Sequence, residues 1–202
     1  HGRMHPDVAL FPINHFYQRE KLVPVPLPHQ QELGLGYDAT PTDQLDKLLM
    51  TRRVLFLDSN DGEEEEANMV ATLLRRIHRF TLQTFNPVKT VGVIVPYRRQ
   101  ITLIRQLLEE PLSNVTIDTV ERFQGSQRDV IIYSFAVNHY FQLDFLTAST
   151  FTDTDGQLVD RKMNVALTRA RRQLIVTGRA DILRKVTLFS SFISQYGLTP
   201  NL

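Results

Sequence analysis

Apolar residues recur along the chain in short runs that alternate with longer amphipathic stretches. The short runs predict buried β-strands at residues 54–57, 91–95, 115–117, 130–135 and 174–176. Apolar positions at helical spacing predict one helix over residues 63–82 and another around residues 101–108. Strands that alternate with helices in this way indicate a three-layer α/β fold with a mainly parallel sheet.

The segments outside this alternating pattern have a different character. Residues 1–42 are rich in proline, which favours extended structure over a helix, and we expect them to form a lead-in that packs on a domain over residues 43–202. Residues 136–160 fit neither periodicity and predict a long connection or surface insertion. Because the chain starts with His1 rather than methionine, we expect it to be a piece of a longer protein.

Composition removes several classes of function. The 202 residues carry a formal net charge of +1, so any nucleic-acid binding must come from a local basic patch. The absence of cysteine excludes a disulfide scaffold and thiolate metal sites, and the six histidines lack metal-ligand spacing, so no metal site is expected. The phosphate-binding sequence G-x-x-x-x-G-K-[ST] is also absent, which means that this chain cannot be a complete ATPase.

A basic segment over residues 161–178 carries the first candidate for chemistry. Met163, Ala166, Leu167 and Ala170 fall at i, i+3, i+4 and i+7, which predicts a helix with one buried face. A helix held down in this way would aim Arg169 rigidly, and a rigid guanidinium suits phosphate recognition. A solvated basic face explains the same segment equally well.

Polar residues follow several of the predicted strands. Because ligands of parallel sheets usually bind where the strands end, Pro96 and Tyr97 and then Thr119 are candidates to contact a ligand. The turn that follows, residues 124–127, contains Gly125, which lets the backbone approach a ligand closely. The alternatives are a polar turn without a ligand and a helix start with solvated arginines.

The acidic run of residues 61–66 stands at the start of a predicted helix. Carboxylates at this position complement the helix dipole, so a structural role explains the run better than a metal site does.

Taken in order, these segments resemble the second RecA-like domain of superfamily 1 helicases, on the branch of the nonsense-mediated-decay helicase and its DNA-directed relatives. The resemblance covers nearly the whole chain and rests on four segments: Arg3-Met4-His5-Pro6, Val95–Gln100, Thr119–Gly125 with Asp129, and Asn164–Arg171. The last segment matches the family's sixth motif without a break. The fold that this implies is a RecA-like domain, of the P-loop NTPase type, without its own Walker motifs.

The resemblance implies roles for individual residues. Arg169 would be an arginine finger that reaches the γ-phosphate of ATP, and Arg3 would be a second cation there. Residues expected at the nucleotide are Tyr97, Gln124, Gly125 and Gln127. Pro96 and Thr119 would hold the backbone of single-stranded DNA or RNA.

The cofactors that the resemblance implies are ATP and Mg²⁺, both held mainly by a first RecA-like domain of the same polypeptide. The location that it implies is the cytoplasm, or the nucleoid if the protein is bacterial, and the nucleus stays open as an alternative. Three positions depart from the family pattern: Gln127 replaces a glutamate, Gly2 replaces a tyrosine, and Val95 replaces a threonine. Together these departures leave open a relative of low activity. Gln127 and the near-neutral charge also keep open a second class of function, a non-catalytic nucleic-acid-binding or scaffold module with the helicase fold.

Overall fold

Five parallel strands form the centre of the molecule in a computed structural model that describes residues 35–59, 62–143, 150–152, 158–160, 166 and 168–197. The strands are β1 (Val54–Asp58), β2 (Val91–Ile94), β3 (Thr116–Asp118), β4 (Arg128–Ser134) and β7 (Ala170–Gly178). Their order across the sheet is β1-β7-β4-β2-β3, and every neighbouring pair is parallel. All five strands therefore start at one edge of the sheet, the amino edge, and end at the opposite one, the carboxyl edge. The predicted parallel α/β fold is confirmed.

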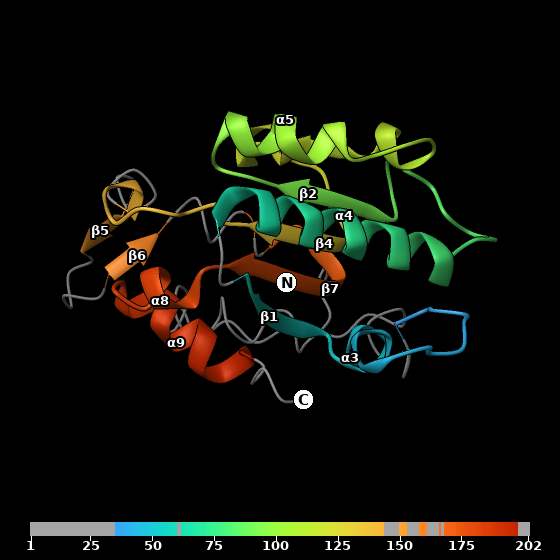
Figure 1. Ribbon diagram of the computed structural model, residues 1–202, viewed down its shortest axis with the longest axis horizontal. Helices are drawn as coiled ribbons and strands as arrows, with labels where there is room; N and C mark the ends of the chain where they lie inside the picture. The colour runs from blue at the N-terminus through green and yellow to red at the C-terminus, as the bar shows by residue number, and fades with distance from the viewer. Residues whose placement is uncertain are drawn as a thin grey trace.

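Successive strand residues point to opposite faces of the sheet and fill two hydrophobic cores. Phe56 belongs to one core, whereas its neighbour Leu55 belongs to the other. The helices α4 (Gly62–Phe80) and α5 (Arg98–Gln106) cover one face, and α8 (Ala180–Leu183) and α9 (Thr187–Tyr196) cover the other (Figure 1). Among the helices of the described residues, none combines the length with the apolar character that a membrane-spanning segment needs.

Shorter elements complete the described structure. They are the helix α3 (Gln44–Thr51), the 3-10 turns η2 (Leu112–Asn114) and η3 (Val120–Phe123), and the antiparallel strands β5 (Thr150–Thr152) and β6 (Leu158–Asp160). The two antiparallel strands fall within the region for which the sequence predicted an insertion.

A buried carboxylate fastens α3 to α4. Asp46 is shielded from solvent and accepts hydrogen bonds from the backbone N–H and the hydroxyl of Thr42, at 2.8 and 2.7 Å. Arg76, at 2.9 Å, and Arg79 donate to the same carboxylate from α4. Burial favours the neutral acid, but these hydrogen bonds prevail and hold the pKa of Asp46 well below its ordinary value.

The structure corrects the boundary predicted for the basic segment. Ala170 does not lie on a helix: it is the first residue of β7, where it pairs with Arg128 of β4. The pairing with β4 decides the conformation here, because the short apolar pattern was compatible with either element. Ala166 is helical and buried, and Thr168 and Arg169 form the turn into the strand. Arg161, Lys162, Met163 and Leu167 lie outside the described residues.

Candidate functional site

The predicted site residues separate into two groups at opposite edges of the sheet. Arg169 comes directly before β7 and Gln127 directly before β4, so both lie at the amino edge. Pro96 follows β2 and Thr119 follows β3, so both lie at the carboxyl edge. The register of β2 with β4, in which Val91 pairs with Val130 and Ile94 with Tyr133, keeps the two groups apart by the length of the strands.

Arg169 is held at the amino edge by its own backbone. Its carbonyl oxygen accepts a hydrogen bond from the backbone N–H of Arg128 at 3.1 Å, and its N–H donates to the carbonyl of Ala166 at 3.1 Å. Its Nε is buried and has no hydrogen-bond partner, and no ion pair of its guanidinium occurs in the described part of the chain. A half-buried arginine without an acidic partner retains its donors for a ligand outside this domain.

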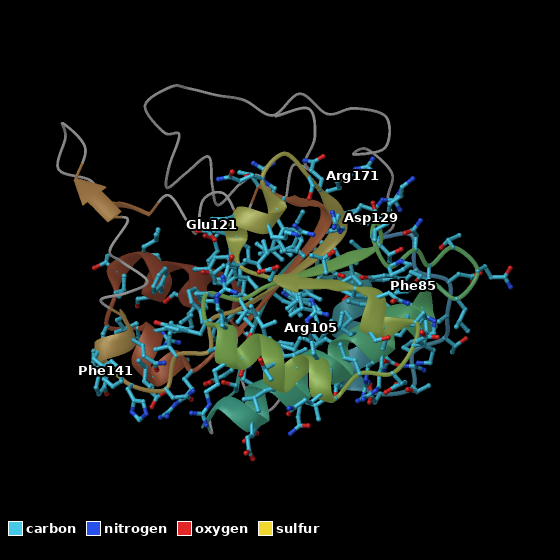
Figure 2. All side chains as sticks on the ribbon, turned by 90° about the horizontal axis from the view of Figure 1, so that it is seen from above. Phe85, Arg105, Glu121, Asp129, Phe141 and Arg171 are labelled. Carbon is cyan, nitrogen blue, oxygen red and sulfur yellow. The ribbon has the colours of Figure 1, made fainter. Side chains whose placement is uncertain are left out.

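The neighbouring arginines are paired with a carboxylate. Arg171 Nη1 lies 3.5 Å and Arg172 Nε 4.0 Å from Oδ1 of Asp129. Figure 2 shows Arg171 and Asp129 together near the amino edge. Half-exposed ion pairs of this kind add little stability, but they offset the positive charge of these two side chains. As far as the structure describes the chain, Arg169 therefore differs from Arg171 and Arg172 in having no acidic partner.

The chain crosses from the carboxyl edge to the amino edge between β3 and β4, so the turn at residues 124–127 does not stay where β3 ends. After η3, the N–H of Ser126 donates to the carbonyl of Phe123 at 3.0 Å, and Gly125 adopts a φ of +73°. That left-handed conformation favours glycine, although a side chain at this position would meet open space. Gln124 and Gly125 are exposed, and Gln127 is half-buried.

Phe123 anchors this turn to the sheet. Its ring lies over Gly92, where a side chain would come within 2.6 Å of the ring. The guanidinium carbon of Arg128 lies 5.3 Å from the centre of the same ring, and Arg128 donates to the hydroxyl of Ser126 at 3.1 Å and to the carbonyl of Gln127 at 3.0 Å. Burial lowers the pKa of Arg128, which acts as an internal brace of the turn. Sequence reasoning had not assigned a role to Arg128.

At the carboxyl edge, Pro96 and Thr119 are brought side by side. Ile94 pairs with Asp118, and the N–H of Val95 donates to the carbonyl of Asp118 at 2.9 Å. The carboxylate of Asp118 then accepts the N–H of Thr119 at 2.8 Å, which fixes the backbone at the point where the strand ends. Two residues that are far apart in the sequence thus form one continuous edge.

Tyr97 lies at the carboxyl edge, away from Arg169 and Gln127. Its ring packs against both hydrophobic cores, and its hydroxyl donates to the carbonyl of Gln142 at 2.7 Å. Burial raises the pKa of Tyr97 to about 12. The structure therefore does not bring Tyr97 together with the other residues expected at the nucleotide.

One residue of the acidic run was misread from the sequence. Glu64 and Glu65 are exposed, as expected of residues at a helix start, but Glu66 is buried at the carboxyl edge. Burial raises its pKa to about 7, against the opposing effect of its hydrogen bonds. The signal was present in the spacing, because Glu66 precedes Val70 by four positions and Leu73 by seven, on the buried face of α4.

Two further expectations concern the roles of Arg3 and Gly2 and the absence of a metal site. Arg3 and Gly2 lie outside them, so their roles stay predictions. Within the described part of the chain, no group of three or more His, Asp or Glu side chains could hold a metal ion. The features that fit a nucleotide phosphate are the unpartnered Nε of Arg169 and the open, left-handed backbone at Gly125.

Comparison with known proteins points to a single family. The family model AAA_12, described as "AAA domain", matches residues 2–181. The chain is 30% identical over 199 residues to the DNA polymerase alpha-associated DNA helicase A of Saccharomyces cerevisiae, covering 91% of this chain and 27% of the relative. It is 30% identical to the helicase sen1 of Schizosaccharomyces pombe (96% of this chain, 11% of the relative) and 28% identical to the Regulator of nonsense transcripts 1 homolog of Drosophila melanogaster (96% and 16%). The chain thus spans about a quarter or less of these relatives.

Proposed function

Because the chain belongs to the AAA_12 family and is a superfamily 1 helicase domain, we propose that it is the second RecA-like domain of an ATP-dependent helicase or translocase. The observation that carries the proposal is the half-buried guanidinium of Arg169, which has no acidic partner among the described residues and lies at the edge of the sheet opposite Pro96 and Thr119. The amino edge of the sheet would contact the phosphates of ATP, and the carboxyl edge would bind a single strand of DNA or RNA.

At the amino edge, Arg169 donates hydrogen bonds to the γ-phosphate of ATP bound on a first RecA-like domain of the same polypeptide. Bound there with Mg²⁺, the nucleotide supplies the phosphoryl group that is transferred to water. A guanidinium suits this task because its charge and its fork of donors match the charge that develops on the phosphoryl oxygens. The turn around Gly125 brings Gln127 toward the same edge, and the side-chain carbonyl of Gln127 can accept a hydrogen bond from a ribose hydroxyl.

At the carboxyl edge, Thr119 donates its hydroxyl to a phosphate of the strand, and Pro96 contacts the sugar and phosphate beside it. Contacts to the backbone carry no base sequence, so strand binding is independent of sequence. The near-neutral net charge of +1 fits a domain that supplies only part of the strand-binding surface.

The rigid sheet connects the two edges. β4 and β7 pair along their lengths, so a displacement of Arg169 relative to the nucleotide carries the carboxyl edge with it. ATP binding closes the cleft between the two domains and hydrolysis reopens it, which moves the strand-holding edge along the nucleic acid.

A non-catalytic module is the second candidate, and the observation that favours it is Gln127 in place of the glutamate that the family usually has at this position. An amide accepts a hydrogen bond more weakly than a carboxylate does, which weakens recognition of the ribose. A protein of this second class binds single strands without ATP turnover.

The test uses the full-length protein with ATP and a single-stranded oligonucleotide. We expect strand-stimulated ATP turnover, and we expect Arg169→Ala to lower it by about 10³-fold or more while ATP still binds. The matched control is Arg171→Ala, a nearby arginine that is paired with Asp129, and it should retain turnover within about threefold. Turnover that survives in Arg169→Ala contradicts the proposal, and a wild-type protein that binds the strand without turnover supports the non-catalytic alternative.

A further inference from the structure

Glu66 joins the ends of three neighbouring strands. Its Oε2 accepts hydrogen bonds from the hydroxyl of Ser134 at the end of β4 and from the hydroxyl of Thr177 near the end of β7, the latter at 3.1 Å. Its Oε1 lies 3.5 Å from the hydroxyl of Ser59, directly after β1. The carboxylate is buried, and so are Ser59, Ser134 and Thr177, so these hydroxyls are its partners in place of water.

The fourth donor is the backbone of a residue in an unfavourable conformation. Ala136 has a φ of +54°, a left-handed conformation that costs free energy for a residue with a side chain. Its N–H donates to Oε2 of Glu66 at 3.0 Å. Ala136 is two residues past the end of β4, so this hydrogen bond fixes the direction in which the chain leaves the sheet.

The segment that leaves β4 is in turn connected to the strand-holding edge at two points. Gln100, buried on α5, lies with its Nε2 3.5 Å from the hydroxyl of Ser134. Tyr97, which precedes α5, donates its hydroxyl to the carbonyl of Gln142 at 2.7 Å. The side chain of Gln142 accepts the N–H groups of residues 138 and 139, at 2.7 and 2.9 Å, and so holds the segment together.

We propose that Glu66 is a positioning residue for strand binding: it fixes the exit of β4 and, through Gln100 and Tyr97, the place of Pro96 at the carboxyl edge. This inference rests on the proposed function, because it assigns the strand to that edge. Glu66 itself is too deeply buried to touch the strand, so its influence passes through the segment from Ser134 to Gln142.

The role needs acceptor atoms at this position rather than a negative charge. In Glu66→Gln, the side-chain carbonyl can take the place of Oε2, and the amide can donate to the hydroxyl of Ser59. Within the described part of the chain, the hydrogen bonds that Glu66 accepts come from hydroxyls and a backbone N–H, and none comes from a charged side chain. The ionisable residues on or directly beside the surrounding elements are Asp58 at the end of β1, Glu64 and Glu65 on α4, Arg98 and Arg99 at the start of α5, and Arg179 directly after β7.

The experiment compares Glu66→Ala and Glu66→Gln in the full-length protein, with Glu65→Ala, an exposed neighbour on the same helix, as the control. We measure the concentration of a 20-nucleotide oligothymidine that gives half-maximal stimulation of ATP turnover, and the KM for ATP. Glu66→Ala should raise the oligothymidine concentration about tenfold and leave the KM within about twofold, because its effect is at the carboxyl edge. Glu66→Gln should restore the wild-type value within about threefold. A parallel loss of both parameters, or a Gln variant as impaired as the Ala variant, overturns the proposal.

A second measurement separates this inference from the proposed function. Hydrogen–deuterium exchange at the amides of residues 134–142 should accelerate in Glu66→Ala and remain near wild type in Glu66→Gln and Glu65→Ala. If the wild-type protein shows no strand-stimulated turnover, the proposed function fails, and the exchange data still decide whether Glu66 fixes the β4 exit. Unchanged exchange in Glu66→Ala shows that it does not.

Discussion

The buried carboxylate of Glu66 makes the stability of this domain depend on pH in a defined direction. Burial raises the pKa from 4.5 to about 7, which corresponds to about 3 kcal/mol at 1.36 kcal/mol per pKa unit. Because the pKa is higher in the folded state, the contribution of this group to stability is fully present below pH 4.5 and is lost as the pH rises through 7. Glu66→Gln keeps the acceptor but cannot ionise, so it lacks this dependence.

Urea unfolding of the 202-residue chain, followed by far-UV circular dichroism at several values between pH 5 and pH 8, gives the measurement. The quantity of interest is the free energy of unfolding of Glu66→Gln minus that of the wild type, because the titration of other groups cancels in the difference. We expect this difference to increase by about 2 to 3 kcal/mol from pH 5 to pH 8, in favour of the variant, because part of the contribution is already lost at pH 5. The same difference for Glu65→Gln, an exposed position, should stay constant. A constant difference for Glu66→Gln refutes the reasoning, since it means that burial leaves the pKa unperturbed.

Three further substitutions test other parts of the structure. Asp46→Asn should lower the free energy of unfolding of the chain by about 2 kcal/mol at pH 7, since it weakens the hydrogen bonds from Arg76. The wild type should lose this contribution as the pH falls below the unfolded pKa of 3.8, and urea titrations that show no such loss would argue against the Asp46 network. Gly92→Ala should push the ring of Phe123 away and raise the KM for ATP of the full-length protein several-fold, and adding Phe123→Leu should reverse part of this increase. An unchanged KM for ATP would mean that the Phe123 ring does not position the turn at residues 124–127. Thr119→Ala should raise the oligothymidine concentration for half-maximal stimulation about fivefold and leave the KM for ATP unchanged, and the reverse pattern would place Thr119 at the nucleotide.

The sheet was readable from the sequence because its strands are short, apolar and separated by amphipathic helices. The periodicity located β1, β2, β3 and β4 to within one or two residues and α4 to within two. Helix α9 was not predicted, although Leu188, Phe189, Phe192 and Ile193 have helical spacing and all lie on its buried face.

The division into two edges could not be predicted, because it depends on the path between β3 and β4. Only nine residues separate Asp118 from Arg128, which is fewer than most crossovers between parallel strands need, so a crossing there was not expected from the sequence. The short crossing is possible because the η3 turn shortens the path and because the ring of Phe123 packs against Gly92. The crossing places Gln127 beside Arg169 and leaves Thr119 behind at the carboxyl edge.

Local patterns also misassigned individual side chains whose partners are distant in the sequence. Glu66 was grouped with its exposed neighbours, whereas its donors come from β1, β4 and β7. A glutamate on the apolar face of a predicted helix is the signal that could have found it, since a buried carboxylate requires several donors.

The central claim, that Arg169 contacts the transferring phosphate, is tested most directly by binding rather than by turnover. The full-length protein should bind ADP with aluminium fluoride and Mg²⁺, a mimic of the transferring phosphoryl group, at least about 100-fold more tightly than ADP with Mg²⁺. Isothermal titration calorimetry of Arg169→Ala should show that this gain has disappeared while the Kd for ADP stays within about threefold of the wild type. An Arg169→Ala variant that retains the full gain would contradict the claim.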